Sequence, residues 1–177
     1  MRPLSLAHAL FAAVLLSLAA TGVFAQNGPP PSDVTPGAAD VTTVVLGGID
    51  VAVAPGYRLV VAEVVIAPGG YVTRHIHASA IVVCVQSGSL GFTIHTGAAT
   101  VTRGGTGAEP EATEPLEPNV EVVLEPRDCV SFDQFATHTE HTAWNAGDEP
   151  TVLTSTRLLK VDEPFTTFVD AQGTPVP

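Results

Sequence analysis

The chain has 177 residues, of which 45% are hydrophobic and only 14% charged, which is enough apolar material for a core and too little charge for a disordered chain. The formal net charge is −11, with 7 basic against 18 acidic residues. Nucleic acids and anionic membrane surfaces bind clustered basic side chains, so this balance argues against both as partners.

Residues 1–25 have the pattern of a secretory signal peptide. Arg2 supplies a short positive start, an apolar stretch runs from Leu4 to Ala20, and Val23-Phe24-Ala25 offers a cleavage site before Gln26. We therefore expect an exported protein, secreted or held in the periplasm or cell envelope, with no membrane attachment after cleavage. The alternative is an uncleaved membrane anchor, although the segment is barely long enough to span a bilayer.

The next segment, residues 26–40 (QNGPPPSDVTPGAAD), has four prolines and no periodic apolar pattern. This composition is typical of a flexible or polyproline-like linker. The sequence therefore predicts one folded domain at residues 41–163, followed by a C-terminal tail at residues 164–177.

Short apolar runs bounded by turn residues continue through the predicted domain, and none has the length and period of an amphipathic helix. Turn signals stand at residues 67–70 (APGG) and 86–89 (QSGS). Many short strands without helices predict an all-β barrel or sandwich. The expected strands are 42–46, 57–67, 71–76, 81–87, 90–95, 119–125, 128–133, 140–145 and 150–160.

A polar stretch at residues 104–118 (GGTGAEPEATEPLEP) interrupts this series of strands. Its density of Pro and Glu does not suit a packed core, so we expect a solvated surface loop. A lid or a weak calcium site is the functional alternative, but the four glutamates lack the regular ligand spacing of a calcium-binding loop.

Two histidines in the segment Gly69-Gly70-Tyr71-Val72-Thr73-Arg74-His75-Ile76-His77 are candidates for metal binding. Residues i and i+2 of a strand point to the same face, so His75 and His77 are expected to project together. Two imidazoles at this spacing suit one divalent metal ion. By itself, however, the H-x-H pattern is a weak signal.

A second segment, His141-Thr142-Ala143-Trp144-Asn145, completes a pattern that resembles the cupin superfamily. The first cupin motif, G-x5-H-x-H-x3-4-E-x6-G, is matched by Gly69, His75, His77 and Gly88. The end of the second, H-x3-N, is matched by His141 and Asn145. The resemblance, close to the small cupin_2-like type, covers about residues 43 to 160. It implies a single jelly-roll β-barrel in which His75, His77 and His141 bind a divalent metal, and neutral imidazoles suit Mn, Fe, Ni, Cu or Zn.

Two departures from the family pattern bear on this site. Ile81 and Val82 occupy the two positions where the first motif has its glutamate, and nothing in the spacing recommends Gln86 or Glu140 as a substitute. Before His141, Ala136 and His138 replace the Pro and Gly of the second motif. His138 is therefore an alternative third ligand, a fourth ligand or an acid–base group at the rim, or an exposed loop histidine.

The two cysteines, Cys84 and Cys129, lie on strands that are neighbours in the jelly roll implied by the resemblance. An oxidising location permits a disulfide between them. The alternative is two buried thiols that act as small hydrophobic side chains.

Three functions remain open at this level. The first is a metal-dependent enzyme that acts on a small molecule. The second is a non-catalytic module that binds a small molecule or sugar, with a degraded metal site. The third is a structural or storage role in the cell envelope. The resemblance also leads us to expect a homodimer, because oligomers are common for this fold.

Overall fold

The structure, a computed structural model, describes residues 27–104 and 111–176; the predicted leader at residues 1–25 lies outside this range. Strands make up most of the described chain, and the one helix among these residues is four residues long. In chain order the elements are β1 (Ala38–Asp50), β2 (Tyr57–Ile76), β3 (Ser79–Ser87), β4 (Leu90–Thr96), β5 (Ala99–Arg103), β6 (Ala112–Leu116), β7 (Val122–Leu124), β8 (Cys129–Asp133), α1 (Gln134–Thr137), β9 (Glu140–Asn145), β10 (Thr151–Lys160) and β11 (Thr167–Phe168).

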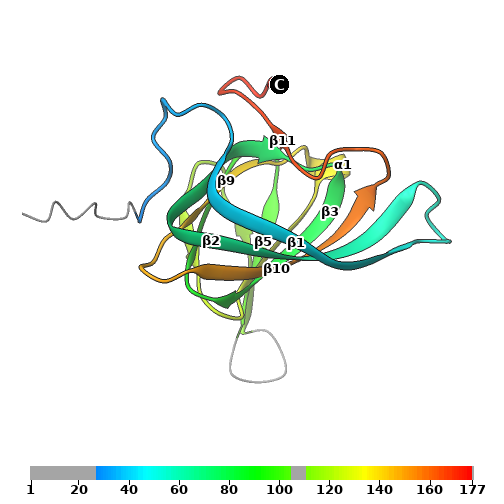
Figure 1. Cartoon of the computed structure of the whole chain (residues 1–177), viewed down its shortest axis with the longest axis horizontal. Coiled ribbons are helices and arrows are strands. Elements are labelled where there is room, and N and C mark those ends of the chain that lie inside the picture. The colour runs from blue at the N-terminus through cyan, green and yellow to red at the C-terminus, as the bar shows by residue number, and fades with distance from the viewer. Residues whose placement is uncertain (1–26, 105–110, 177) are drawn as a thin grey trace, which may run out of the picture.

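The strands form one antiparallel sheet that curls round into a barrel (Figure 1). Its order is β6-β5-β8-β3-β10-β2-β9-β4-β7, and both β1 and β11 also pair with β2. Neighbours in this order are mostly distant in sequence, as expected of a jelly roll rather than a meander. The predicted fold class, an all-β jelly-roll barrel, is confirmed.

Strand β2 changes its partners halfway along its length. Its first half, up to Ile66, pairs with β1 and β10. In residues 71–76 strand β9 takes the place of β10, and on the other side β1 pairs with residues 71 and 72 and β11 with residues 75 and 76. The segment 67–70, predicted as a turn, instead continues the strand. A bend is possible there because Gly69 has a φ of 78° and a Cβ on Gly70 would lie 2.9 Å from the Asp40 carbonyl oxygen. The bend directs the H-x-H segment alongside β9.

The core lies inside the curl, where alternate side chains of the strands meet. Strand β10 shows the alternation most clearly, because every second residue from Thr151 to Arg157 is buried. The core cluster consists of Ile66, Ile81, Val85, Leu90, Phe92, Ile94, Ala99, Val101, Leu116, Leu124, Val130, Phe132 and Leu153. The β-branched residues and leucines of the predicted strands supply most of this set.

The structure corrects two details of the predicted strand pattern. Residues 112–116, expected to be part of a solvated loop, form β6, whose Leu116 is buried in the core and faces Ala99 of β5. Neither β5 nor β6 was predicted, because two short Thr-rich and Pro-containing runs give little periodicity. Residues 105–110 of the predicted loop lie outside the described residues.

The ordered barrel also extends beyond both limits of the predicted domain, 41–163. Strand β1 begins at Ala38, and Gly37 exchanges backbone and side-chain hydrogen bonds with Thr73 of β2. At the other end, β11 lies within the predicted tail and pairs with the last two residues of β2. The part of the predicted linker nearest the barrel and the start of the tail therefore belong to the fold.

Cys84 and Cys129 form a disulfide between directly opposed residues of β3 and β8. The bond joins two strands that are 45 residues apart in sequence, so it closes a long loop of the chain. Of the two alternatives for the cysteines, the disulfide is the one present. Within residues 27–104 and 111–176, no helix has the length and apolar character needed to cross a membrane.

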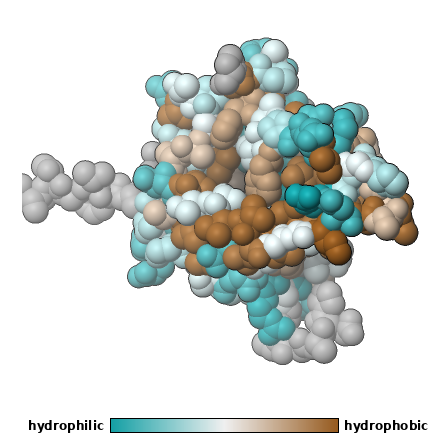
Figure 2. Space-filling model, turned by 45° about the vertical axis from the view of Figure 1, so that its right-hand side comes forward, coloured by the Kyte–Doolittle hydropathy of each residue, from teal (hydrophilic) through white to brown (hydrophobic). Residues whose placement is uncertain are grey.

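The hairpin formed by β1 and the start of β2 projects from the barrel at the right of Figure 1. It carries exposed apolar side chains, which Figure 2 shows as brown areas on this side of the molecule. Strand β1 pairs with β2 alone among the described strands, so its outer edge is open. The most exposed apolar residues of this β1 patch are Val44, Val45, Leu46 and Ile49.

Candidate metal centre

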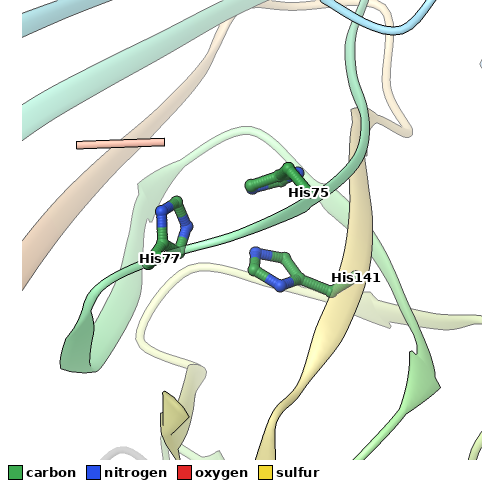
Figure 3. Close-up of side chains that lie close together, drawn as sticks. All are labelled: His75, His77 and His141. Carbon is green, nitrogen blue, oxygen red and sulfur yellow. The ribbon is translucent and has the colours of Figure 1, made fainter. Parts of the chain in front are cut away.

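Three histidines meet inside the barrel: His75 from the end of β2, His77 just after that strand, and His141 from β9 (Figure 3). His75 lies directly opposite His141 in the β2–β9 ladder, and His77 follows two residues later on the same side. One ligand nitrogen from each ring lies within 4.8 Å of the other two. The ring centroids of His75 and His141 are 4.0 Å apart. The backbone register that pairs the two motif strands therefore creates the cluster.

Backbone carbonyls orient two of the rings. Nδ1 of His75 lies 2.7 Å from the carbonyl oxygen of Thr73, and Nδ1 of His77 lies 2.8 Å from that of Phe165. Because a carbonyl only accepts hydrogen bonds, the Thr73 contact places the proton of His75 on Nδ1 and leaves its lone pair on Nε2. Nδ1 of His77 lies near both the Phe165 carbonyl, which accepts, and Nη1 of Arg157, which only donates. In metal sites, a histidine ligand usually hydrogen-bonds through its second ring nitrogen to a carbonyl or carboxylate, which fixes the orientation of the ring.

The third ring, His141, has a different environment. Its Nδ1 is buried and makes no hydrogen bond to the described residues. Two aromatic rings hold it instead, since Phe132 and Phe92 lie 4.8 Å and 5.1 Å from its centroid. A buried imidazole nitrogen without a partner is costly, and this cost marks the ring as a group kept for binding.

Burial keeps all three histidines uncharged at neutral pH. Each is less than 5% exposed, and desolvation lowers the pKa of His75 to about 4 and the pKa values of His77 and His141 well below 6.5. The positive charge of Arg157 lowers all three pKa values further. Neutral imidazole is the form that binds a metal ion. The donor set, its protonation state and its spacing fit one divalent transition metal.

A cavity of about 130 Å³ adjoins the three rings. Its walls are mainly apolar, from strands on both sides of the barrel, with Phe165 and Phe168 of the C-terminal segment also lining it. Among the described lining residues no side chain carries a carboxylate. The cavity can therefore hold a small molecule beside the histidines, in surroundings that contain little water.

The structure distinguishes the alternatives for the third histidine. His138 is exposed and ends α1 with a φ of 50°, so its side chain lies outside the cluster that contains His141. Neither suggested replacement for the motif glutamate reaches the site: Gln86 is exposed, and Glu140 forms an ion pair with Arg74. Ile81 belongs to the apolar core. The role of the three clustered histidines as ligands stays a prediction.

Sequence reasoning missed Arg157 and the C-terminal segment around Phe165. Arg157 lines the cavity, and its Nη1 lies 3.1 Å from Nδ1 of His77. One signal was available, because Arg157 continues the inward-facing series of β10 that includes Leu153 and Ser155. Phe165 had no such signal, since its position depends on a chain segment returning over the barrel.

No family model and no curated protein matches the sequence significantly. The solved structures with a similar backbone include the following three proteins. A cupin 2 domain-containing protein from Halorhodospira halophila has 22% identity and a TM-score of 0.45, over 77% of this chain and 73% of that one. KdgF from Halomonas sp. has 14% identity and a TM-score of 0.46, over 70% and 83%. A cupin-2 domain protein from Rhodospirillum rubrum has 13% identity and a TM-score of 0.43, over 82% and 76%.

The predicted resemblance to cupins is confirmed at the level of the fold. The described chain is a curled antiparallel sheet, and the strands that carry the two motifs, β2 and β9, are hydrogen-bonded neighbours. Asn145, the last residue of the second motif, is fully buried and donates to the carbonyls of Ile66 and Glu149. It therefore holds the turn after β9 against β2 and has no part in the histidine cluster.

Proposed function

We propose that the protein binds one divalent transition metal through one ring nitrogen each of His75, His77 and His141, and that it acts on a small molecule in the adjoining cavity. The observation that carries this proposal is the convergence of three buried, neutral imidazoles within 4.8 Å. A bound metal of this kind supplies a Lewis acid that polarises an oxygen-bearing group.

The chain contributes orientation and a dry environment. Carbonyl oxygens of Thr73 and Phe165 fix the rings of His75 and His77, so the ligand nitrogens need little reorganisation when a metal binds. The apolar walls restrict water and strengthen electrostatic interactions with a polarised substrate. This arrangement supports a metal-dependent enzyme.

One observation favours a non-catalytic binding module instead. In a three-histidine site the metal occupies the imidazoles, so they are not free to transfer protons. No carboxylate among the described residues lines the cavity. The described walls therefore offer no carboxylate as a proton-transferring group. A protein that binds its small molecule without changing it would need the same histidines and the same cavity.

The proposal is tested by purifying residues 26–177 without chelators or nickel resin and measuring bound metals by elemental mass spectrometry. We expect close to one metal ion per chain in the wild type and a loss of most of it in His75→Ala and His141→Ala. His138→Ala is the matched control and should retain the metal, because this side chain is exposed and outside the cluster. A wild type that takes up no Mn, Fe, Ni, Cu or Zn contradicts the proposal.

We also propose that the protein works outside the cytoplasm, in the secreted or periplasmic space. The leader pattern of residues 1–25 and the Cys84–Cys129 disulfide support this location, because disulfides persist mainly in oxidising compartments. Fractionation of cells that express the full chain should recover a product beginning at Gln26 in the exported fraction. Recovery of uncleaved chain in the cytoplasm contradicts the proposal.

We propose that the protein forms a homodimer through the β1 patch. Val45, Leu46 and Ile49 are more than half exposed on a strand whose outer edge is open, and the same strand of a second copy could pair with it around a two-fold axis. Light scattering should give twice the mass of the chain, and Val45→Lys should shift the protein toward the monomer. Val82→Lys, on an exposed apolar residue of β3, is the control that should leave the mass unchanged.

A further inference from the structure

Arg157 is a buried charge that the metal-binding proposal does not use. It lies on β10, is 5% exposed, and lines the same cavity as the three histidines. Its Nε donates to Ser155 Oγ at 2.8 Å, and its Nη1 donates to the carbonyl of Phe165 at 2.9 Å. The guanidinium stacks 3.6 Å from the centre of the Phe165 ring. The group is thus held in one orientation.

No counter-charge accompanies this guanidinium among the described residues. The ion pairs in residues 27–104 and 111–176 involve other basic side chains, and no carboxylate lines the cavity. Directly across the β3–β10 ladder from Arg157 lies Ile81, the residue at the position where the cupin motif has its glutamate. The position of the motif glutamate is therefore apolar in this chain, and the residue that faces it on β10 is positively charged.

A buried, unpaired charge is strongly unfavourable unless a partner neutralises it. A purely structural clamp on the Phe165 carbonyl would not require a charge, since a neutral donor could make the same hydrogen bond. The Nη2 group makes no hydrogen bond to the described residues, and the hydroxyl proton of Ser155 is also uncommitted after Oγ accepts from Arg157. These groups form a donor set at the cavity wall that lacks an anion.

We propose that the cavity binds a small molecule with a carboxylate group, held by Arg157 and Ser155 beside the histidine cluster. The volume of about 130 Å³ equals roughly four water molecules, which limits the ligand to a small acid. A carboxylate suits the site better than a tetrahedral phosphate, because the wall offers few donors and one positive charge. The inference names the class of molecule bound in the cavity. Its statement that a metal lies beside this molecule rests on the proposed function.

Metal and anion should strengthen each other's binding. The charge of Arg157 already acts on all three histidines, so a metal ion added there meets a second positive charge in a buried space. A carboxylate between them neutralises part of both. By linkage, the anion then raises metal affinity by the same factor that the metal raises anion affinity.

The test is titration of chelator-treated and Zn²⁺-loaded protein with sodium acetate in a low-chloride buffer, followed by calorimetry and thermal denaturation. We expect acetate to bind and protect the wild type, neutral acetamide to have no effect, and Arg157→Met and Arg157→Gln to weaken acetate binding at least about tenfold. Zn²⁺ should tighten acetate binding in the wild type. Arg58→Met, which removes an exposed arginine paired with Asp50, is the matched control and should bind acetate normally.

Three results would overturn the inference. The first is that acetate has no effect on the wild type, and the second is that the wild type and both Arg157 variants bind acetate equally. The third is that the wild type binds inorganic phosphate in preference to acetate. Zn²⁺ uptake is measured separately in the same samples. Arg157-dependent acetate binding without metal uptake contradicts the proposed function alone, whereas metal uptake without acetate binding contradicts this inference alone.

Discussion

Acidification should destabilise the metal-free protein through its buried histidines. His75 is fully buried, and desolvation lowers its pKa from 6.5 to about 4. Between these two pH values the unfolded chain binds a proton at this residue that the folded chain does not. Stability therefore rises with pH across this window, is fully present above pH 6.5, and is lost as the pH falls toward 4.

The magnitude follows from the pKa difference. The step from 6.5 to about 4 for His75 corresponds to about 3 kcal/mol of unfolding free energy. Burial lowers the pKa values of His77 and His141 in the same direction, so they add to the loss, although the three rings influence one another and do not add independently. Because domains of this size are typically stable by about 5–15 kcal/mol, the effect should be easy to observe.

The assay is urea denaturation at a series of pH values in the presence of a chelator. The wild type should lose stability steadily between pH 6.5 and about 4. The ion-paired Asp128 contributes at lower pH: burial raises its pKa, but hydrogen bonds from Arg103 and from backbone N–H groups outweigh this and bring it below 3.8. The histidine window is therefore separate from that of Asp128.

The variant His75→Gln removes one of the three titrating rings and should flatten this part of the curve. Saturation with Zn²⁺ should steepen it, because protons then compete with the metal for the ligand nitrogens. Stability that stays level between pH 7 and about 4.5 in the wild type would refute the reasoning, and so would an unchanged slope in His75→Gln.

Three further variants test the fold around the site by thermal or urea denaturation. Replacing Cys84 and Cys129 together by Ser should lower the free energy of unfolding by at most about 4 kcal/mol, the entropy of closing a 45-residue loop, and reducing agent should have no further effect. Gly91→Ala should cost about 1–3 kcal/mol, because its Cβ would lie 2.0 Å from the Trp144 indole; no loss would show that the indole has room to move. Asn145→Ala should cost about 3 kcal/mol, since it leaves the buried Ile66 carbonyl unpaired, and a neutral outcome would contradict that role.

The sequence predicted the fold class because period-two patterns and turn residues act locally. Strands such as residues 90–95 and 140–145 were expected close to their observed limits. The segments that were missed depend on distant contacts: Leu116 of β6 is buried only because β5 lies beside it, and β11 pairs only because the chain returns over β2. Composition within these segments does not encode such contacts.

For the site, spacing alone predicted that His75 and His77 share a face, and the second motif pointed to His141. Both follow from strand geometry, and the structure brings the three together. Arg157 was not predicted, since one basic residue in a strand usually faces solvent. Its burial depends on the position of β10 between β2 and β3, which the sequence pattern does not specify.

Titration of chelator-treated protein with Co²⁺, followed by visible absorption, tests the central claim most directly. The account predicts saturation at one Co²⁺ per chain, with the spectrum lost in His75→Ala, His77→Ala and His141→Ala and retained in His138→Ala. Saturation that survives these three replacements, or the absence of any Co²⁺ spectrum in a folded wild type, would contradict a metal centre built from the three barrel histidines.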